Sequence, residues 1–313
     1  MVDYIIETRN LTKRFGKQTA VNSLDMKIEK GKIYGLLGKN GAGKTTTMCM
    51  LLNLSKPTNG EIFFFGKHYK QDPYDVYSKI GSIIETPGFY ENLSAFDNLK
   101  VFAKLRGDYN KEDIKKALEI VSLTHAKDKK FKNFSLGMKQ RLGIAAAIMH
   151  NPEILILDEP INGLDPMGIK EIRKLLKDLS EVYGTTILIS SHILSEIEAI
   201  ADVIGVMDGG LLIEEVSMNQ LHEKLNKHVK FEVSDSDLAC KILEKLTLKE
   251  NIDFSVNENN IHLYNHLDLR AEFNEQFVKS GIKVNEMSIC EESLEEYFTK
   301  IIDKKERYGE FNA

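Results

Sequence analysis

Excess positive charge, long apolar runs and cysteine are all scarce in this 313-residue sequence. The formal net charge is -5, without the basic excess that binding to a phosphate backbone requires, so nucleic acid is not expected as a partner. The longest apolar runs, near residues 33–37 and 154–157, fall far short of the roughly 20 residues of a membrane-spanning helix. A role at a membrane therefore requires docking onto another protein.

The cysteines and the N-terminus predict where the chain resides. Cys49, Cys240 and Cys290 are odd in number, widely spaced and without the spacing of metal ligands, which is typical of thiols in a reducing compartment. The stretch MVDYIIETRNLTKRF has no apolar core followed by a small-residue cleavage site, so no secretory signal is expected. These features predict a cytosolic protein.

Short apolar runs bounded by Gly, Asp or Asn alternate with longer helical patterns from about residue 4 to 218. This alternation predicts an α/β domain over residues 1–220 with a largely parallel sheet. The expected strands include residues 33–37, 154–157, 186–189 and 203–207. Between about residues 92 and 150 the pattern becomes almost wholly helical, which predicts a helical subdomain inserted into the sheet domain.

A second, smaller domain is predicted at residues 221–305. Its pattern reads strand, helix, strand, strand, helix, strand, the βαββαβ order of a ferredoxin-like α+β unit, followed by an acidic amphipathic helix from Glu291. Residues 306–313 are expected to be a frayed tail. Because this fold hosts many unrelated roles, both a homodimer contact and a regulatory role stay open.

The segment GKNGAGKT, residues 38–45, fits the phosphate-loop pattern G-x-x-x-x-G-K-[ST] between an apolar strand and a helical pattern. Glycines let backbone N–H groups converge on phosphate oxygens, and the following helix directs its positive end toward the anion. Lys44 is predicted to reach the β and γ phosphates, and the Thr45 hydroxyl to ligate Mg²⁺. The alternative is a glycine-rich turn with an incidental lysine, which the two flanks disfavour. The nucleotide-binding residues predicted in this segment are Gly38, Asn40, Gly41, Gly43, Lys44, Thr45 and Thr46.

The second half of such a site is an apolar strand that ends in acids, and ILILDE, residues 154–159, supplies it. Asp158 is predicted to hold Mg²⁺ through water, because Mg²⁺ retains much of its hydration shell. Glu159 is predicted to polarise the attacking water as general base. Taken alone, the segment is equally consistent with a buried strand capped by two acids. The presence of the phosphate loop favours a nucleotide site with Mg²⁺ and a general base.

The segment FSLGMKQR, residues 134–141, distinguishes among phosphate-loop proteins. With it, the sequence resembles the ATP-binding subunits of ABC transporters, whose signature is a Ser-x-Gly turn at the start of a helix in a helical subdomain. Ser135 and Gly137 match this signature, whereas Leu136 and Met138 replace the commoner glycine and glutamine. In this family the signature closes on the γ-phosphate held by a second subunit.

Other residues follow the order of the same family over residues 4–218. GLDP, which includes Asp165, is similar to the loop by which each subunit contacts its partner. His192, in ISSH, matches the histidine at the γ-phosphate, and Phe15, in KRFGK, matches the aromatic residue that stacks on adenine. The resemblance implies a P-loop ABC-type ATPase with ATP and Mg²⁺, in which two subunits, identical or paralogous, sandwich two ATP molecules. Its catalytic residues would be Glu159, His192 and Lys44.

Glu85, in IIETPGFY, follows the strand that precedes the helical subdomain. Family members usually have a glutamine there, which contacts Mg²⁺ and relays the nucleotide state to the membrane subunit. A carboxylate keeps an oxygen ligand, with those of Thr45 and Asp158, but adds negative charge beside phosphates. A glutamate at this position resembles subunits that serve lantibiotic immunity, and the segment FSLGMKQRLGIA and the C-terminal extension resemble the bacitracin-resistance and lantibiotic-immunity branch. The alternative is a solvated strand end.

The resemblance implies an ATPase that energises an exporter of antimicrobial peptides and binds the inner face of the membrane through integral permease subunits. A soluble ABC-type ATPase with a remodelling role, or the ATPase of an exporter for another substrate, stays open. A single ATP domain, the lack of long heptads and the acidic balance disfavour translation and DNA-repair relatives. The aromatic residues Phe89, Tyr90, Phe96 and Phe102 either dock a cytoplasmic helix of the permease or pack within the domain.

Overall fold

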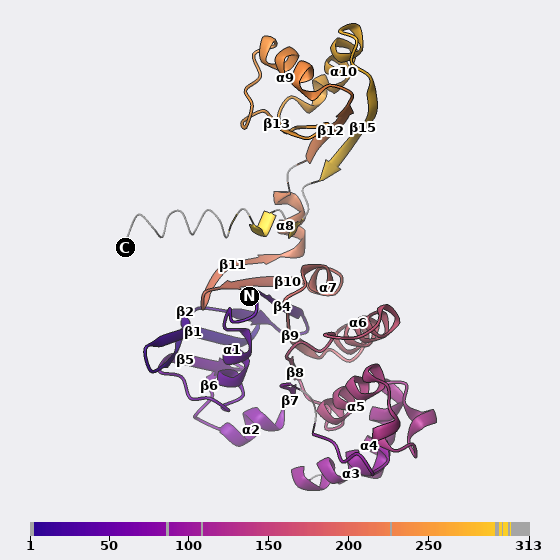
Figure 1. Cartoon of the computed structure of the whole chain (residues 1–313). Helices are drawn as coiled ribbons and strands as arrows, with labels where there is room; N and C mark the ends of the chain where they lie inside the picture. The colour runs from indigo at the N-terminus through magenta and orange to yellow at the C-terminus, as the bar shows by residue number, and fades with distance from the viewer. Residues whose placement is uncertain are drawn as a thin grey trace. The chain divides into compact units, whose positions relative to one another are not determined.

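The computed structural model describes residues 3–85, 88–107, 109–225 and 227–291, together with 294, 295, 297–299 and 301. The chain divides into two compact units, Met1–Met218 and Asn219–Ala313 (Figure 1). Within the described ranges, no helix has the length and the apolar character that crossing a bilayer requires.

The first unit contains a six-stranded sheet in the order β11-β10-β4-β9-β8-β7, in which only β11 runs antiparallel to its neighbour. Its strands are β4 (Ile33–Leu37), β7 (Ile80–Ile83), β8 (Ile154–Leu157), β9 (Thr186–Ser191), β10 (Val203–Asp208) and β11 (Leu211–Ser217). Every residue of β4 and β8 is buried, which explains their unbroken apolar runs. This sheet confirms the predicted α/β fold class.

A second, antiparallel sheet was not anticipated. It has the order β2-β1-β5-β6, with β3 also paired to β1. Its strands are β1 (Tyr4–Phe15), β2 (Gln18–Leu24), β3 (Lys27–Glu29), β5 (Asn59–Phe64) and β6 (Lys67–His68). The expectation of one largely parallel sheet was incomplete, because β1 lacks a regular two-residue alternation of buried and exposed positions. Helix α1 (Lys44–Leu51) packs between the sheets, where its Met48 shares a core with Ile6 of β1 and Leu36 of β4 (Figure 1).

The helical segment of this unit lies between β7 and β8 in the chain. It contains α3 (Ala95–Arg106), α4 (Lys111–Ile120) and α5 (Leu136–Ile148), with 3-10 turns at Thr124–Ala126 and Phe131–Asn133. Ser94, Asn110 and Ser135 precede these helices, and the side chain of each accepts a hydrogen bond from the first turn. The other helices of the unit are α2 (Pro73–Ser78), α6 (Pro166–Glu181) and α7 (Leu194–Glu198). Because β7 and β8 are parallel neighbours, the helical segment leaves the sheet at the end of β7, beside Asp158, and returns at the opposite end, at the start of β8.

The second unit has an antiparallel sheet in the order β13-β14-β12-β15. Its elements after α8 (Met218–Lys224) are β12 (Lys227–Val233), α9 (Ser236–Lys245), β13 (Phe254–Asn257), β14 (Asn260–Leu263), the 3-10 turn η3 (Leu267–Leu269), α10 (Arg270–Lys279) and β15 (Val284–Glu291). Leu243 of α9 and Phe277 of α10 pack with Phe231 of β12 in its core. The βαββαβ order matches the predicted ferredoxin-like unit. The helix expected from Glu291 was placed too early, because Glu291 still belongs to β15; the expected tail, 306–313, lies outside the described residues.

Candidate functional site

The turn between β4 and α1 forms a backbone cradle. Gly41 has φ +86° and Gly43 has φ +106°, a conformation that L side chains rarely adopt. A Cβ added at Gly38 would lie 2.4 Å from the Met207 carbonyl oxygen, and one at Gly43 would lie 2.6 Å from that of Ala20. The fold therefore requires glycine here, and the bare backbone with the N-terminus of α1 suits a phosphate group.

Lys44, the first residue of α1, extends back over this cradle. Its Nζ atom donates to the carbonyl oxygens of Gly38 and Lys39, at 2.6 and 3.3 Å. Nζ also lies 3.4 Å from Oε1 of Glu159, and only 5% of the side chain is exposed. The loop and the end of β8 thus fix the ammonium group between them.

Asp158, which follows β8, accepts two hydrogen bonds from hydroxyl groups. Thr45 Oγ1 donates to its Oδ2 at 2.7 Å, and Ser190 Oγ donates to its Oδ1 at 2.6 Å. Ser190 Oγ in turn accepts from the backbone N–H of Glu159 at 2.9 Å. A carboxylate beside a threonine hydroxyl offers the oxygen ligands that Mg²⁺ prefers, so this donor set fits the predicted metal.

Glu159 lies between a cation and an imidazole. Its Oε2 atom lies 2.8 Å from Nδ1 of His192, while Oε1 faces Lys44. Since an ionised carboxylate only accepts hydrogen bonds, the imidazole donates from Nδ1. The backbone of Glu159 has φ +48°, which is uncommon for a residue other than glycine. With 22% of its side chain exposed, the carboxylate is oriented and still accessible to water.

Glu85 lies in the bend after β7, is exposed and has φ +60°. Burial raises the pKa of the Cys49 thiol on α1, and the negative charges of Asp158 and Glu85 raise this pKa further. The backbone N–H of Asp158 donates to the carbonyl oxygen of Ile83 at 2.9 Å, so Glu85 comes two residues after a strand end that is bonded to Asp158. No described hydrogen bond joins Glu85 to Thr45 or Asp158. Pro87, in the expected turn, lies outside the described residues.

Phe15 ends β1 at a hairpin with β2, and 54% of it is exposed. Lys13 Nζ lies 4.8 Å from the centre of its ring. An exposed ring of this kind offers a flat face for stacking. Of the other predicted loop residues, Asn40 is exposed and Thr46 is half-buried.

The predicted signature and partner loop lie side by side. Ser135 caps α5 and accepts from the Met138 N–H at 3.3 Å, and Asp165 caps α6. A Cβ added at Gly137 would lie 3.9 Å from a side-chain atom of Leu164, the residue before Asp165. In the described part of the chain, no hydrogen bond or ion pair connects Ser135 or Asp165 with the phosphate loop. The helix caps Ser135 and Asp165 thus belong to a surface that is distinct from the site around Lys44 and Glu159.

Ser190 is the residue of the site that sequence reasoning missed. It is wholly buried in β9 and bridges the side chain of Asp158 and the backbone of Glu159. The available signal was a pair of hydroxyl residues, Ser190 and Ser191, at the end of a buried strand directly before His192.

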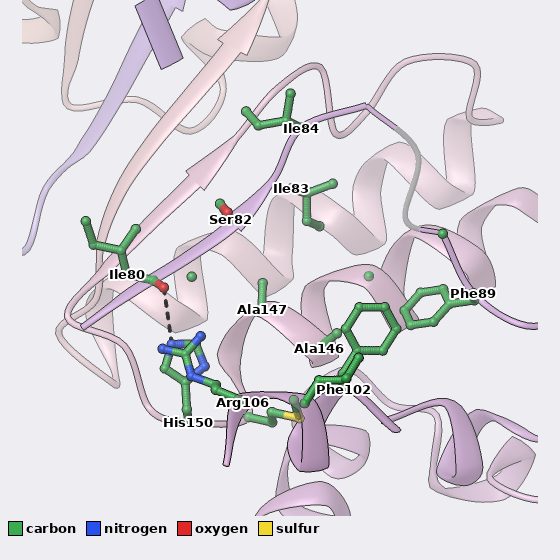
Figure 2. A pocket seen from close by; sticks show the side chains of 15 residues that line it. Ile80, Ser82, Ile83, Ile84, Phe89, Phe102, Arg106, Ala146, Ala147 and His150 are labelled. Atoms are coloured by element: carbon green, nitrogen blue, oxygen red, sulfur yellow. Dashed lines mark hydrogen bonds between the residues drawn. The ribbon is translucent and has the colours of Figure 1, made fainter. Parts of the chain in front are cut away.

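A groove of about 490 Å³ lies between β7 and the helical segment (Figure 2). Its apolar lining side chains include Ile80, Ile83, Ile84, Phe89, Phe102, Leu105, Ala146 and Ala147. Phe89 and Phe102 contact each other with ring centroids 5.2 Å apart, whereas Tyr90 and Phe96, also considered for docking, do not line the groove. Arg106 and His150 lie at the end away from Phe89 (Figure 2). The groove is therefore apolar along its length and polar at one end.

Comparison with known proteins identifies clear relatives. The family model described as ABC transporter matches residues 21–162. The bacitracin transport ATP-binding protein BcrA of Enterococcus faecalis is 54% identical over 302 residues, which cover 96% of this chain and 97% of that protein. The lantibiotic transport ATP-binding protein SrtF of Streptococcus pyogenes is 45% identical over 231 residues, covering 73% of this chain and 99% of SrtF. Among solved structures, cbiO1 from Clostridium perfringens, part of the ABC transporter complex cbiONQ, has a TM-score of 0.65 at 27% identity and covers 78% of this chain and 96% of its own.

Proposed function

The chain belongs to the family of ABC transporter ATP-binding subunits, and on this premise we propose that it energises an exporter of antimicrobial peptides of the bacitracin or lantibiotic type. ATP hydrolysis is intrinsic to the family, so the chain is an ATPase. The names of BcrA and SrtF describe bacitracin and lantibiotic transport, and they support this substrate class.

The observation that best supports this function is the Glu159 carboxylate between Lys44 and His192. In the proposed reaction, Glu159 orients a water and accepts its proton as the water oxygen attacks the γ-phosphorus of ATP and ADP leaves. Lys44 binds the β and γ phosphates from the cradle, and His192 keeps the carboxylate oriented. Mg²⁺ bound at Thr45 and Asp158 would neutralise charge on the phosphates. Positioning and electrostatics thus account for most of the rate enhancement.

A second subunit completes the proposed site. The N-terminus of α5, with Ser135 and Gly137, offers unpaired backbone N–H groups of a first helical turn to an anion. We assign this surface to the γ-phosphate held by the partner subunit, with Asp165 in the contacting loop. The partner is either a second copy or a paralogue.

The groove between β7 and the helical segment is the proposed docking site for a cytoplasmic helix of the permease. An apolar helix face would contact Phe89 and Phe102, and polar groups of the permease would meet Arg106 and His150 (Figure 2). Glu85 comes two residues after Ile83, which ends β7 and lines this groove. Docking here would hold the chain on the cytoplasmic face of the membrane and place Glu85 between nucleotide and permease.

The test compares the survival of a deletion strain complemented with the natural chain, with Lys44→Ala or with Lys67→Ala under bacitracin and a panel of lantibiotics. Lys67 is an exposed lysine of β6 and serves as the matched control. We expect the natural chain and Lys67→Ala to restore resistance and Lys44→Ala to fail. Equal survival of all strains against every peptide would remove the peptide assignment, while phosphate release by purified protein tests the ATPase separately.

A further inference from the structure

The outer edge of β15 is unpaired in the described part of the chain and carries two exposed apolar side chains. The sheet order places β15 at an edge, where β12 is its one partner among the strands that the structure describes. Natural edge strands are commonly protected by lysine, proline or shortness. The eight residues VNEMSICE contain neither lysine nor proline, and their only charged residues are Glu286 and Glu291. The pairing with β12 is regular from Glu286 to Glu291, with an irregularity only beside Asn285.

Two apolar side chains of this edge face solvent. Met287 is 43% exposed and Ile289 is 59% exposed. They pair with Phe231 and Val229 of β12, whose side chains are buried in the core, so they share the helix-covered face of the sheet. Within the described residues, the apolar face of the sheet therefore extends to Met287 and Ile289 at its edge.

We propose that β15 pairs with β15 of a second copy of this chain, which joins two four-stranded sheets into one across a two-fold axis. A two-fold axis perpendicular to the sheet keeps each side chain on its own face of the sheet. Two residues that lie opposite each other must therefore both have even numbers or both have odd numbers. The permitted registers near the strand centre are thus centred on Met287, Ser288 or Ile289. Only the register centred on Ser288 places each Met287 opposite an Ile289, so that all four exposed apolar side chains become cross-strand pairs.

The charges of the strand fit the same register. Glu286 lies opposite Cys290 of the partner subunit, and Glu291 opposite Asn285 of the partner subunit, so no like charges oppose each other. The backbone groups on the outer edge gain strand hydrogen bonds at the same time. A single strand pair is small compared with a standard protein interface of roughly 1,600 Å², so this contact is a weak one. It requires no nucleotide and is therefore independent of the proposed ATP sandwich.

Disulfide trapping in the full-length chain tests the register. In a background with Cys49, Cys240 and Cys290 replaced by serine, Ser288→Cys is expected to form a linked dimer under mild oxidation without nucleotide. Glu286→Cys is the matched control, because it lies on the same face and the same strand. In the Ser288-centred register its two copies are four residues apart, roughly 13 Å, beyond the reach of a disulfide. If Cys290 is restored in the Glu286→Cys variant, a linked dimer should form, because position 286 lies opposite Cys290 of the partner subunit in this register.

Linkage of Ser288→Cys no greater than that of Glu286→Cys would overturn the proposal.

Sedimentation without nucleotide and with EDTA gives a second measurement of the dimer. We expect Met287→Lys combined with Ile289→Lys to weaken the dimer by at least about tenfold. Val278→Lys, at a 58% exposed apolar position on α10, should leave it unchanged. A natural chain that remains monomeric at the highest concentration reached would also contradict the proposal, and circular dichroism checks that each variant is folded.

Discussion

Nδ1 of His192 lies 2.8 Å from Oε2 of Glu159, and this contact joins the ends of two neighbouring parallel strands. Leu157 of β8 pairs with Ile189 of β9, so both strands end at the same edge of the sheet. The residues that follow, Asp158 and Glu159 on one side and His192 on the other, therefore meet beside the phosphate loop. The parallel register thus positions the proposed base beside the phosphate loop.

Glu159→Gln is expected to lower kcat at least about 100-fold, because an amide cannot accept the proton of the attacking water. ATP binding should persist, since the cradle and Lys44 are unchanged, and the ATP-bound dimer should last longer because hydrolysis no longer opens it. Phosphate release, nucleotide binding and sedimentation with ATP measure these effects. The control is Glu153→Gln, because Glu153 directly precedes β8 and forms an ion pair with Lys30. Normal steady-state hydrolysis by Glu159→Gln would refute the assignment of the base.

His192→Ala should lower kcat by about one to two orders of magnitude, because Glu159 loses the partner that orients it. His125→Ala, an exposed histidine of the helical segment, should have no effect. A double-mutant cycle with Glu159→Gln separates the roles, since two residues that act together give a strongly non-additive effect. Additive losses would mean that His192 acts without Glu159.

Gly43→Ala should destabilise the folded chain by about 1–3 kcal/mol, because the residue combines φ +106° with a 2.6 Å approach to the Ala20 carbonyl. Gly16→Ala is the matched control: φ is +57° there, but nothing lies within 4 Å of the added Cβ. Its cost should be about 1 kcal/mol or less. Urea unfolding of the two variants measures the difference, and equal costs would show that the close approach can relax.

The sequence predicted the parts of this fold whose signals are local. The phosphate loop, the buried strands β4 and β8 and the acids after β8 follow from glycine spacing and unbroken apolar runs. Ser190 could not be assigned in this way, because its role depends on the β8-β9 register, which brings residues 32 positions apart into contact. The antiparallel sheet was missed for a related reason: β1 pairs with three strands, and its burial pattern reflects all of them.

Alkylation of Cys49 tests the position of Glu85. Burial and the charges of Asp158 and Glu85 raise the pKa of this thiol, so at a given pH less thiolate is present and iodoacetamide reacts more slowly than with an unfolded chain. In a background with Cys240→Ser and Cys290→Ser, Glu85→Gln removes one negative charge, lowers the pKa of Cys49 and should speed its alkylation near pH 8. Added salt should reduce the difference. Glu91→Gln is the control, and equal rates for both variants would place Glu85 away from α1.

Glu85→Gln also separates mechanism from lineage. Removing a negative charge that acts on Cys49 in α1, the helix that follows the phosphate loop, should tighten ATP binding by a few-fold, while the amide retains an oxygen for Mg²⁺. If Glu85 relays the nucleotide state to the permease, peptide resistance in cells should fall even though purified protein still hydrolyses ATP. Glu85→Ala removes the oxygen as well as the charge, so a further loss in that variant would identify Glu85 as a metal-side ligand. If Glu85→Gln leaves both hydrolysis and resistance unchanged, the glutamate marks a branch of the family and has no part in coupling.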